Sequence, residues 1–242
     1  MKHKKLKIGL LIALATLVAL ATVFFIYVGI YYEANWDLIN KIEYTGYTQK
    51  EIDSGTLAFV PNGEYKSGIV FYPGGKVGRD AYIPLMRALA SKGALCILVD
   101  MPFNLAVFDI SRADGVRDGF DKVEKWYMAG HSLGGSMACS YVADNKDSFA
   151  GVILLAAYST EDLSQTNLSV LSIYGSEDLV LNKESYAENK QNLPNGFSEL
   201  VIEGGNHAYF GTYGEQSGNG VAKITNREQI EITANKIVEF VK

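Results

Sequence analysis

The chain has 242 residues, of which 48% are apolar and 20% charged, so it can form one domain with a sizeable core and is not a disordered protein. Four of its lysines lie in residues 1–7, and the remainder carries 18 basic and 27 acidic residues, a formal charge of −9. Such a surface repels nucleic acid and anionic lipid headgroups, and we expect the domain to bind neither.

The first 32 residues predict a membrane anchor. Residues 1–7, "MKHKKLK", form a basic leader, and residues 8–32 contain no charged side chain. As a helix, this stretch would rise about 37 Å, enough to cross a hydrocarbon core of about 30 Å. Because lysines precede it and Glu33 follows it, we expect a cytoplasmic leader and an extracytoplasmic domain. The alternative is a signal peptide cleaved after "ALA" at 19–21, but the apolar run continues well past that site, which favours an uncleaved signal anchor.

After a polar connector at 33–55, residues 56–242 alternate short apolar runs with longer amphipathic ones. This alternation predicts an α/β domain whose mainly parallel sheet is covered by helices on both faces. Strands are expected at 56–61, 68–72, 94–100, 125–130, 151–158, 169–175 and 198–205. Helices are expected from a cap at Asp80 to Gly93, around Val116–Val123, over 132–144, and from the capping box "TNRE" at 225–228.

The cysteines and histidines do not form a metal-binding pattern. Cys96 and Cys139 each lie in an apolar stretch and are expected to be buried free thiols. No metal-ligand spacing accompanies the three histidines. We therefore expect neither a metal nor an organic cofactor.

The motif "GHSLG" at 130–134 matches the pattern G-x-S-x-G. Ser132 follows a predicted strand and precedes a predicted helix, which is the setting of a nucleophile elbow. The nucleophile of such an elbow has a strained backbone, and side chains at Gly130 and Gly134 would clash. The motif therefore predicts that Ser132 is a catalytic nucleophile.

A serine nucleophile needs a base, and the chain offers three histidines. His3 lies in the basic leader, and His131 is the sequence neighbour of the nucleophile and would point away from it. His207 follows the strand at 198–205 and so lies at the carboxyl edge of the sheet, where catalytic groups of such sheets collect. By elimination, His207 is the predicted base.

An acid is needed to orient the base. Asp178 directly follows the strand at 169–175 and is the first choice, and the adjacent Glu177 is the second. With Asp178, the chain order is serine, aspartate, histidine, which is the order of the α/β-hydrolase triad.

The oxyanion hole needs two backbone donors. One is expected from Leu133, the residue after the nucleophile, and the other from Gly75 in the loop after strand 68–72, with the neighbouring Lys76 left open. We expect the substrate site to be framed by residues 101–108, Tyr82, Tyr158 and the loop 211–220. The predicted substrate-binding residues are Lys76, Tyr82, Asn104 and Tyr158.

The chain from about residue 68 onward resembles the α/β-hydrolase superfamily, and more narrowly a compact bacterial group related to dienelactone hydrolases that carries its domain behind a membrane anchor. The resemblance rests on "FYPGGKV", "MPFNLAVF", "GHSLGGSMA", "LLAAY", "SIYGSEDLVL" and "EGGNHAYFGTYG". It implies Ser132 as nucleophile, Asp178 as acid and His207 as base. Dienelactone hydrolases use a cysteine nucleophile, so their substrate does not carry over. Only "STEDLSQTNL" stands where many relatives insert a lid, which implies no lid domain and an open site.

Together these features predict a single-pass serine hydrolase of the cell membrane that cleaves carboxylic esters through an acyl-enzyme. Its substrate would be a small molecule or an acylated envelope component, and an open site predicts a preference for short acyl chains. The alternative is a non-catalytic envelope binding protein that retains the hydrolase fold.

Overall fold

The computed structural model describes residues 2–53 and 55–242, so Met1 of the predicted leader and Ser54 of the predicted connector lie outside the described residues. The chain divides into two compact units, Met1–Tyr31 and Tyr32–Lys242. In the first unit, helix α1 covers Lys2–Gly29 and therefore ends before the predicted limit at residue 32. Its segment Lys4–Gly29, with a mean hydropathy of 2.6, is long and apolar enough to cross a membrane, a property that signal sequences share.

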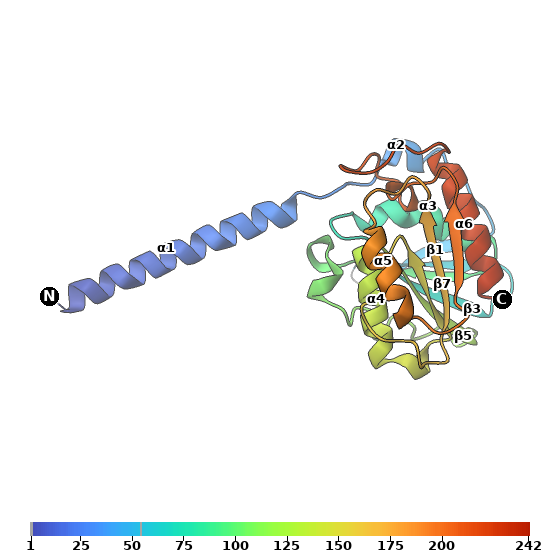
Figure 1. Ribbon diagram of the computed structural model, residues 1–242, viewed down its shortest axis with the longest axis horizontal. Coiled ribbons are helices and arrows are strands. Elements are labelled where there is room, and N and C mark those ends of the chain that lie inside the picture. The colour runs from blue at the N-terminus through green and yellow to red at the C-terminus, as the bar shows by residue number, and fades with distance from the viewer. Residues whose placement is uncertain (1, 54) are drawn as a thin grey trace. The chain divides into compact units, whose positions relative to one another are not determined.

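The second unit contains one sheet of eight strands in the order β1-β2-β4-β3-β5-β6-β7-β8 (Figure 1). The strands from β4 through β8 along this order are parallel, and β1 and β2 are antiparallel additions beside β4. The predicted, mainly parallel sheet is thus confirmed. The strands are β1 Tyr47–Asp53, β2 Thr56–Pro61, β3 Ser67–Tyr72, β4 Leu95–Leu98, β5 Lys125–His131, β6 Gly151–Leu155, β7 Ser169–Gly175 and β8 Ser198–Ile202.

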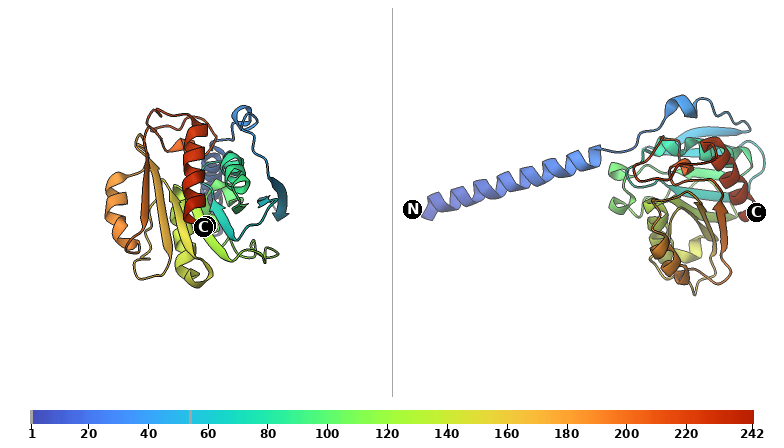
Figure 2. Two further views of the ribbon diagram at one scale, coloured as in Figure 1. Left: turned by 90° about the vertical axis from the view of Figure 1, so that its right-hand side faces the viewer. Right: turned by 45° about the horizontal axis from the view of Figure 1, so that its top comes forward.

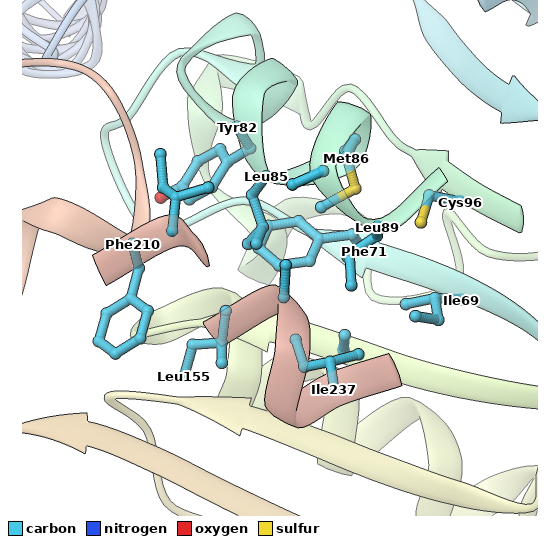
Figure 3. Close-up of a cluster of buried hydrophobic side chains, with 14 of the residues drawn as sticks. Ile69, Phe71, Tyr82, Leu85, Met86, Leu89, Cys96, Leu155, Phe210 and Ile237 are labelled. Carbon is cyan, nitrogen blue, oxygen red and sulfur yellow. The ribbon is translucent and has the colours of Figure 1, made fainter. Parts of the chain in front are cut away.

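Helices cover both faces of this sheet (Figures 1 and 2). Helices α3 (Ile83–Ser91) and α6 (Asn226–Phe240) pack on one face, and α4 (Leu133–Asp144) packs on the other, the face that α5 (Lys183–Asn189) also reaches. Because side chains alternate along a strand, the buried runs of the central strands supply both cores. Figure 3 shows the first core, where Leu85, Met86 and Leu89 of α3 and Ile237 of α6 gather around Phe71.

Two predicted helices differ from the structure. Residues around Val116–Val123 form turns, because Gly115 and Gly119 take φ angles of +72° and +82° that a right-handed helix does not allow. The helix predicted from Asp80 begins with a 3-10 turn at Arg79–Tyr82 and becomes α3 only afterwards. Asp80 does not cap it but pairs with the Arg79 guanidinium at 2.6 Å.

The predicted connector also differs, because part of it is folded. Residues 36–39 form the short helix α2 (Trp36–Ile39), and β1 pairs with β2 along most of its length. The folded unit therefore starts well before residue 56. Helix α5 was not predicted, whereas the capping box of Thr225 and Glu228 at the start of α6 is confirmed, as are the buried free thiols Cys96 and Cys139.

Candidate active site

Ser132 lies at the sharp turn from β5 into α4. Its φ and ψ angles are 51° and −125°, a strained conformation for a residue with a side chain, and its N–H donates to the carbonyl of Leu155 at 2.9 Å. A Cβ on Gly130 would approach the Gly134 backbone to 2.5 Å, and one on Gly134 would collide with the backbone oxygens of Tyr72 and Pro73. The turn packs this tightly only because both positions are glycine, and it leaves Ser132 partly exposed at the carboxyl edge of the sheet.

Asp178 and His207 meet at the same edge, from the loops after β7 and β8. His207 Nδ1 lies 2.9 Å from Asp178 Oδ2, and the two side chains are 2% and 0% exposed. The second oxygen, Oδ1, accepts hydrogen bonds from the N–H groups of Val180 and Leu181 at 2.9 and 2.8 Å. A buried carboxylate held in this way fixes the ring of the histidine, leaving Nε2 as the nitrogen that can exchange a proton.

Glu177, the second choice for the acid, faces a different partner. Its Oε1 lies 2.6 Å from Lys223 Nζ, and this hydrogen bond lowers the pKa of the Glu177 carboxyl below its ordinary value. Of the two candidates, Asp178 is therefore the one that contacts His207.

A buried glutamine of α6 supports the loop that carries His207. Gln229 is fully buried, and its Oε1 accepts from the Asn206 N–H while its Nε2 donates to the Asn206 carbonyl, at 2.9 and 2.8 Å. Asn219 Oδ1 also accepts from the His207 N–H at 3.1 Å. Sequence analysis did not find this support, although a glutamine on the apolar stripe of α6 was a signal that could have been followed.

The loop after β3 brings backbone N–H groups toward the start of α4. The Gly74 N–H donates to the Tyr82 hydroxyl, and the Lys76 N–H donates to the Asn104 carbonyl at 2.8 Å. The Gly75 N–H between them has no acceptor among the described residues. A Cβ on Gly75 would lie 3.2 Å from Leu133 Cβ, so Gly75 and Leu133 are direct neighbours. Two N–H groups placed in this way can hold an anionic oxygen.

Tyr82 is hydrogen-bonded to this loop. It is fully buried, so the expectation that its side chain lines an open substrate site is wrong. Its hydroxyl accepts from the Gly74 N–H at 2.9 Å and lies 2.8 Å from His131 Nδ1. Since a backbone N–H can only donate, the hydroxyl proton of Tyr82 is available to a neutral His131.

His131 contacts both Tyr82 and His207 in the buried part of the site. Burial is the main cause that holds its pKa well below the ordinary value, and the nearby His207 adds to this effect. The two imidazole rings lie 4.5 Å apart between centroids. His131 thus connects the loop of Gly74 with the candidate base while remaining neutral itself.

The other predicted substrate residues lie around this edge. Lys76, Asn104 and Tyr158 are partly exposed, and the φ angles of Lys76 and Asn104 are 58° and 56°. The Tyr158 carbonyl accepts from Ser136 Oγ of α4 at 2.8 Å. Residues 156–168 join β6 to β7 without a helix or a strand, as expected for a site without a lid. Contact of these side chains with a substrate stays a prediction.

Comparison with known proteins assigns the chain to a family. The sequence model of the alpha/beta hydrolase family matches residues 68–231. The chain belongs to the alpha/beta hydrolase family. The resemblance derived from the sequence motifs is thus confirmed, together with the fold.

Solved structures agree with this assignment at the level of the fold. Dienelactone hydrolase from Anabaena variabilis superposes with a TM-score of 0.61 at 15% identity, covering 82% of this chain and 100% of that one. Est1E from Butyrivibrio proteoclasticus gives a TM-score of 0.58 at 16% identity, covering 81% and 99%. Among curated protein sequences, none matches this chain.

Proposed function

We propose that this member of the alpha/beta hydrolase family is a membrane-anchored serine hydrolase that cleaves carboxylic esters outside the cytoplasm. The observation that carries the proposal is that a strained, partly exposed Ser132 and the hydrogen-bonded pair of Asp178 and His207 follow parallel strands at the same carboxyl edge of the sheet. Family membership supports the general chemistry, which is hydrolysis.

In the proposed reaction, Ser132 Oγ attacks the carbonyl carbon of the ester while His207 Nε2 takes the hydroxyl proton. Asp178 stabilises the imidazolium through Nδ1–H, and the N–H groups of Leu133 and Gly75 stabilise the oxyanion. The intermediate expels the alcohol, which receives the proton from His207, and leaves an acyl group on Ser132. Water attacks this acyl-enzyme with His207 again as base and releases the acid.

The support for Gly75 over Lys76 as the second oxyanion donor comes from hydrogen bonding. The Lys76 N–H is engaged by the Asn104 carbonyl, whereas the Gly75 N–H has no acceptor in the described part of the chain. Lys76, Asn104 and Tyr158 remain proposed substrate contacts, because each is partly exposed and follows a strand at the same edge of the sheet as Ser132.

Helix α1 is proposed as an uncleaved anchor with the domain on the extracytoplasmic side. Protease added to intact cells is then expected to degrade the domain. A domain that is protected in intact cells and digested only after lysis would contradict this orientation.

A fluorophosphonate probe tests the chemistry, since it phosphonylates only an activated serine. The wild-type protein should be labelled, Ser132→Ala should not, and Glu177→Gln should be labelled at the wild-type rate. Labelling of Ser132→Ala at the wild-type level would refute the assignment of the nucleophile.

A further inference from the structure

The first residue of the folded unit is hydrogen-bonded to the candidate oxyanion loop. The N–H of Tyr32, its first residue, donates to the Lys76 carbonyl at 2.8 Å, and its own carbonyl accepts from the Gly78 N–H at 2.9 Å. The Tyr32 hydroxyl accepts from the Ser217 N–H at 3.2 Å. The start of the unit is therefore fastened to the loop that carries Gly75.

This attachment limits the distance between a membrane and the site. The candidate span ends at Gly29, and three residues of extended chain cover at most about 11 Å. If the span lies in a bilayer, Tyr32 and the loop bonded to it lie within about that length of chain from its end. The loop bonded to Tyr32 follows β3 and therefore lies at the carboxyl edge of the sheet.

The exposed large apolar side chains of the folded unit lie mainly at this edge. Phe103, Val107, Phe108 and Ile110, which we call the apolar rim, are 44%, 45%, 48% and 36% exposed and follow β4. The Phe103 and Phe108 rings pack edge to face with centroids 5.6 Å apart. Among the described residues of the folded unit, the full set is Trp36, Leu38, Phe103, Val107, Phe108, Ile110, Leu179, Val201, Val221 and Ile232.

The rim is joined to the candidate site by backbone contacts. Asn104 follows Phe103 of the rim, and its carbonyl accepts from the Lys76 N–H. The carbonyl of the same Lys76 accepts from the Tyr32 N–H, so Lys76 links the segment of the rim to the start of the folded unit. Trp36 and Leu38 lie on α2, a few residues after Tyr32, and Leu179 and Val221 follow β7 and β8. Only Val201 on β8 and Ile232 on α6 lie elsewhere. Scattered exposed apolar residues are ordinary, but a group at one edge marks an interaction surface.

The chemistry of this surface favours lipid over a charged partner. Aromatic side chains such as Trp36 and Phe108 favour the boundary between water and acyl chains. The residues after the leader carry a formal charge of −9, so attraction to anionic headgroups does not hold the domain there. Burial of apolar area remains as the driving force.

We propose that the apolar rim inserts into the interface of the bilayer that anchors the chain, and that the substrate is an ester whose long acyl chain stays in that bilayer. The inference rests on the proposed function and on the proposed anchor. It fits a site without a lid, because a chain that stays in lipid needs no tunnel in the protein. The expected preference for short chains then applies to substrates in water.

The test uses the full chain in phosphatidylcholine vesicles. Rates are measured with p-nitrophenyl palmitate dissolved in the bilayer and with p-nitrophenyl acetate in water, which share a leaving group. For Val107→Ser/Phe108→Ser, the ratio of the palmitate rate to the acetate rate should fall about tenfold, since less apolar area holds the site at the lipid. Ile232→Ser, at an exposed apolar position on α6, is the matched control and should keep the wild-type ratio.

A second readout does not depend on activity. In vesicles of brominated phosphatidylcholine, a tryptophan in Phe108→Trp should be quenched beyond the wild-type signal, and one in Ile232→Trp should not. Absence of this extra quenching, or an unchanged rate ratio in the double variant, would overturn the role of the rim. Failure of wild-type labelling by a fluorophosphonate would refute the proposed function instead, and the quenching would still decide whether the rim contacts lipid.

Discussion

Replacing Tyr82 with phenylalanine removes one oxygen at the centre of the candidate site. The ring would keep its packing against Phe71, 5.0 Å away between centroids, so the change isolates the hydroxyl. Its two partners, the Gly74 N–H and His131 Nδ1, lie in buried surroundings and would lose their hydrogen bonds. A buried polar group left unpaired costs about 1–3 kcal/mol, so with two such groups the free energy of unfolding should fall by about 2–6 kcal/mol.

The same change should affect catalysis. Gly74 positions the adjacent Gly75, and loss of one oxyanion donor lowers kcat about 10²–10³-fold in other enzymes. If the Gly75 N–H is displaced but still present, the fall in kcat should be smaller than on its complete loss. We expect kcat to fall about tenfold with KM nearly unchanged. Hydrolysis of p-nitrophenyl acetate measures both constants, and thermal unfolding in detergent measures stability.

The matched control is Tyr186→Phe. The Tyr186 hydroxyl is bonded to Ser172 Oγ at 2.8 Å, on the face of the sheet opposite α3. This variant should lose about 1–2 kcal/mol of stability and keep its kcat. If Tyr82→Phe also keeps the wild-type kcat, Tyr82 does not position the oxyanion loop and the reasoning fails.

Three further changes test the surrounding groups. Asp178→Asn should lower kcat about 10³-fold without unfolding the protein, because the carboxylate no longer stabilises the imidazolium of His207, and a kcat within tenfold of wild type would contradict its role. His131→Gln should flatten the loss of stability on acidification. The pKa of buried His131 is depressed, so below about pH 6.5 only the unfolded chain takes up its proton, and wild-type stability falls by up to about 1.4 kcal/mol per pH unit. Thermal unfolding from pH 7 to 5 measures this slope, and equal slopes for both proteins would refute the neutral state of His131. Gln229→Leu should cost about 2–4 kcal/mol of unfolding free energy, because the Asn206 N–H and carbonyl both lose their partner, and an unchanged melting temperature would show that this support is dispensable.

The sequence predicted the sheet well because its central strands are buried on both faces. A short, continuous apolar run such as that of β4 is typical of a strand buried on both faces. The alternation of such runs with helices predicted that the strands are parallel. The glycines of the elbow and the places of Asp178 and His207 after their strands indicated the candidate triad, since the carboxyl ends of parallel strands meet at one edge.

The rest depends on contacts between distant parts of the chain. Tyr82 has the apolar spacing of a helix and gave no sign that its hydroxyl would meet Gly74 and His131. β1 is a polar edge strand with mostly exposed side chains, so it lacks the periodic pattern on which prediction relies. The turns at Gly115 and Gly119 were missed because apolar spacing alone suggested a helix there.

The central claim is that Ser132 carries the acyl group during turnover. The direct measurement is to quench the protein with acid during hydrolysis of p-nitrophenyl acetate and to map acetylated peptides by mass spectrometry. The account predicts one acetyl group, on Ser132, and, when a slowly hydrolysed carbamate ester is used instead, a carbamoyl group that accumulates on the same residue. An acyl group on another residue, or full hydrolysis by Ser132→Ala, would contradict it.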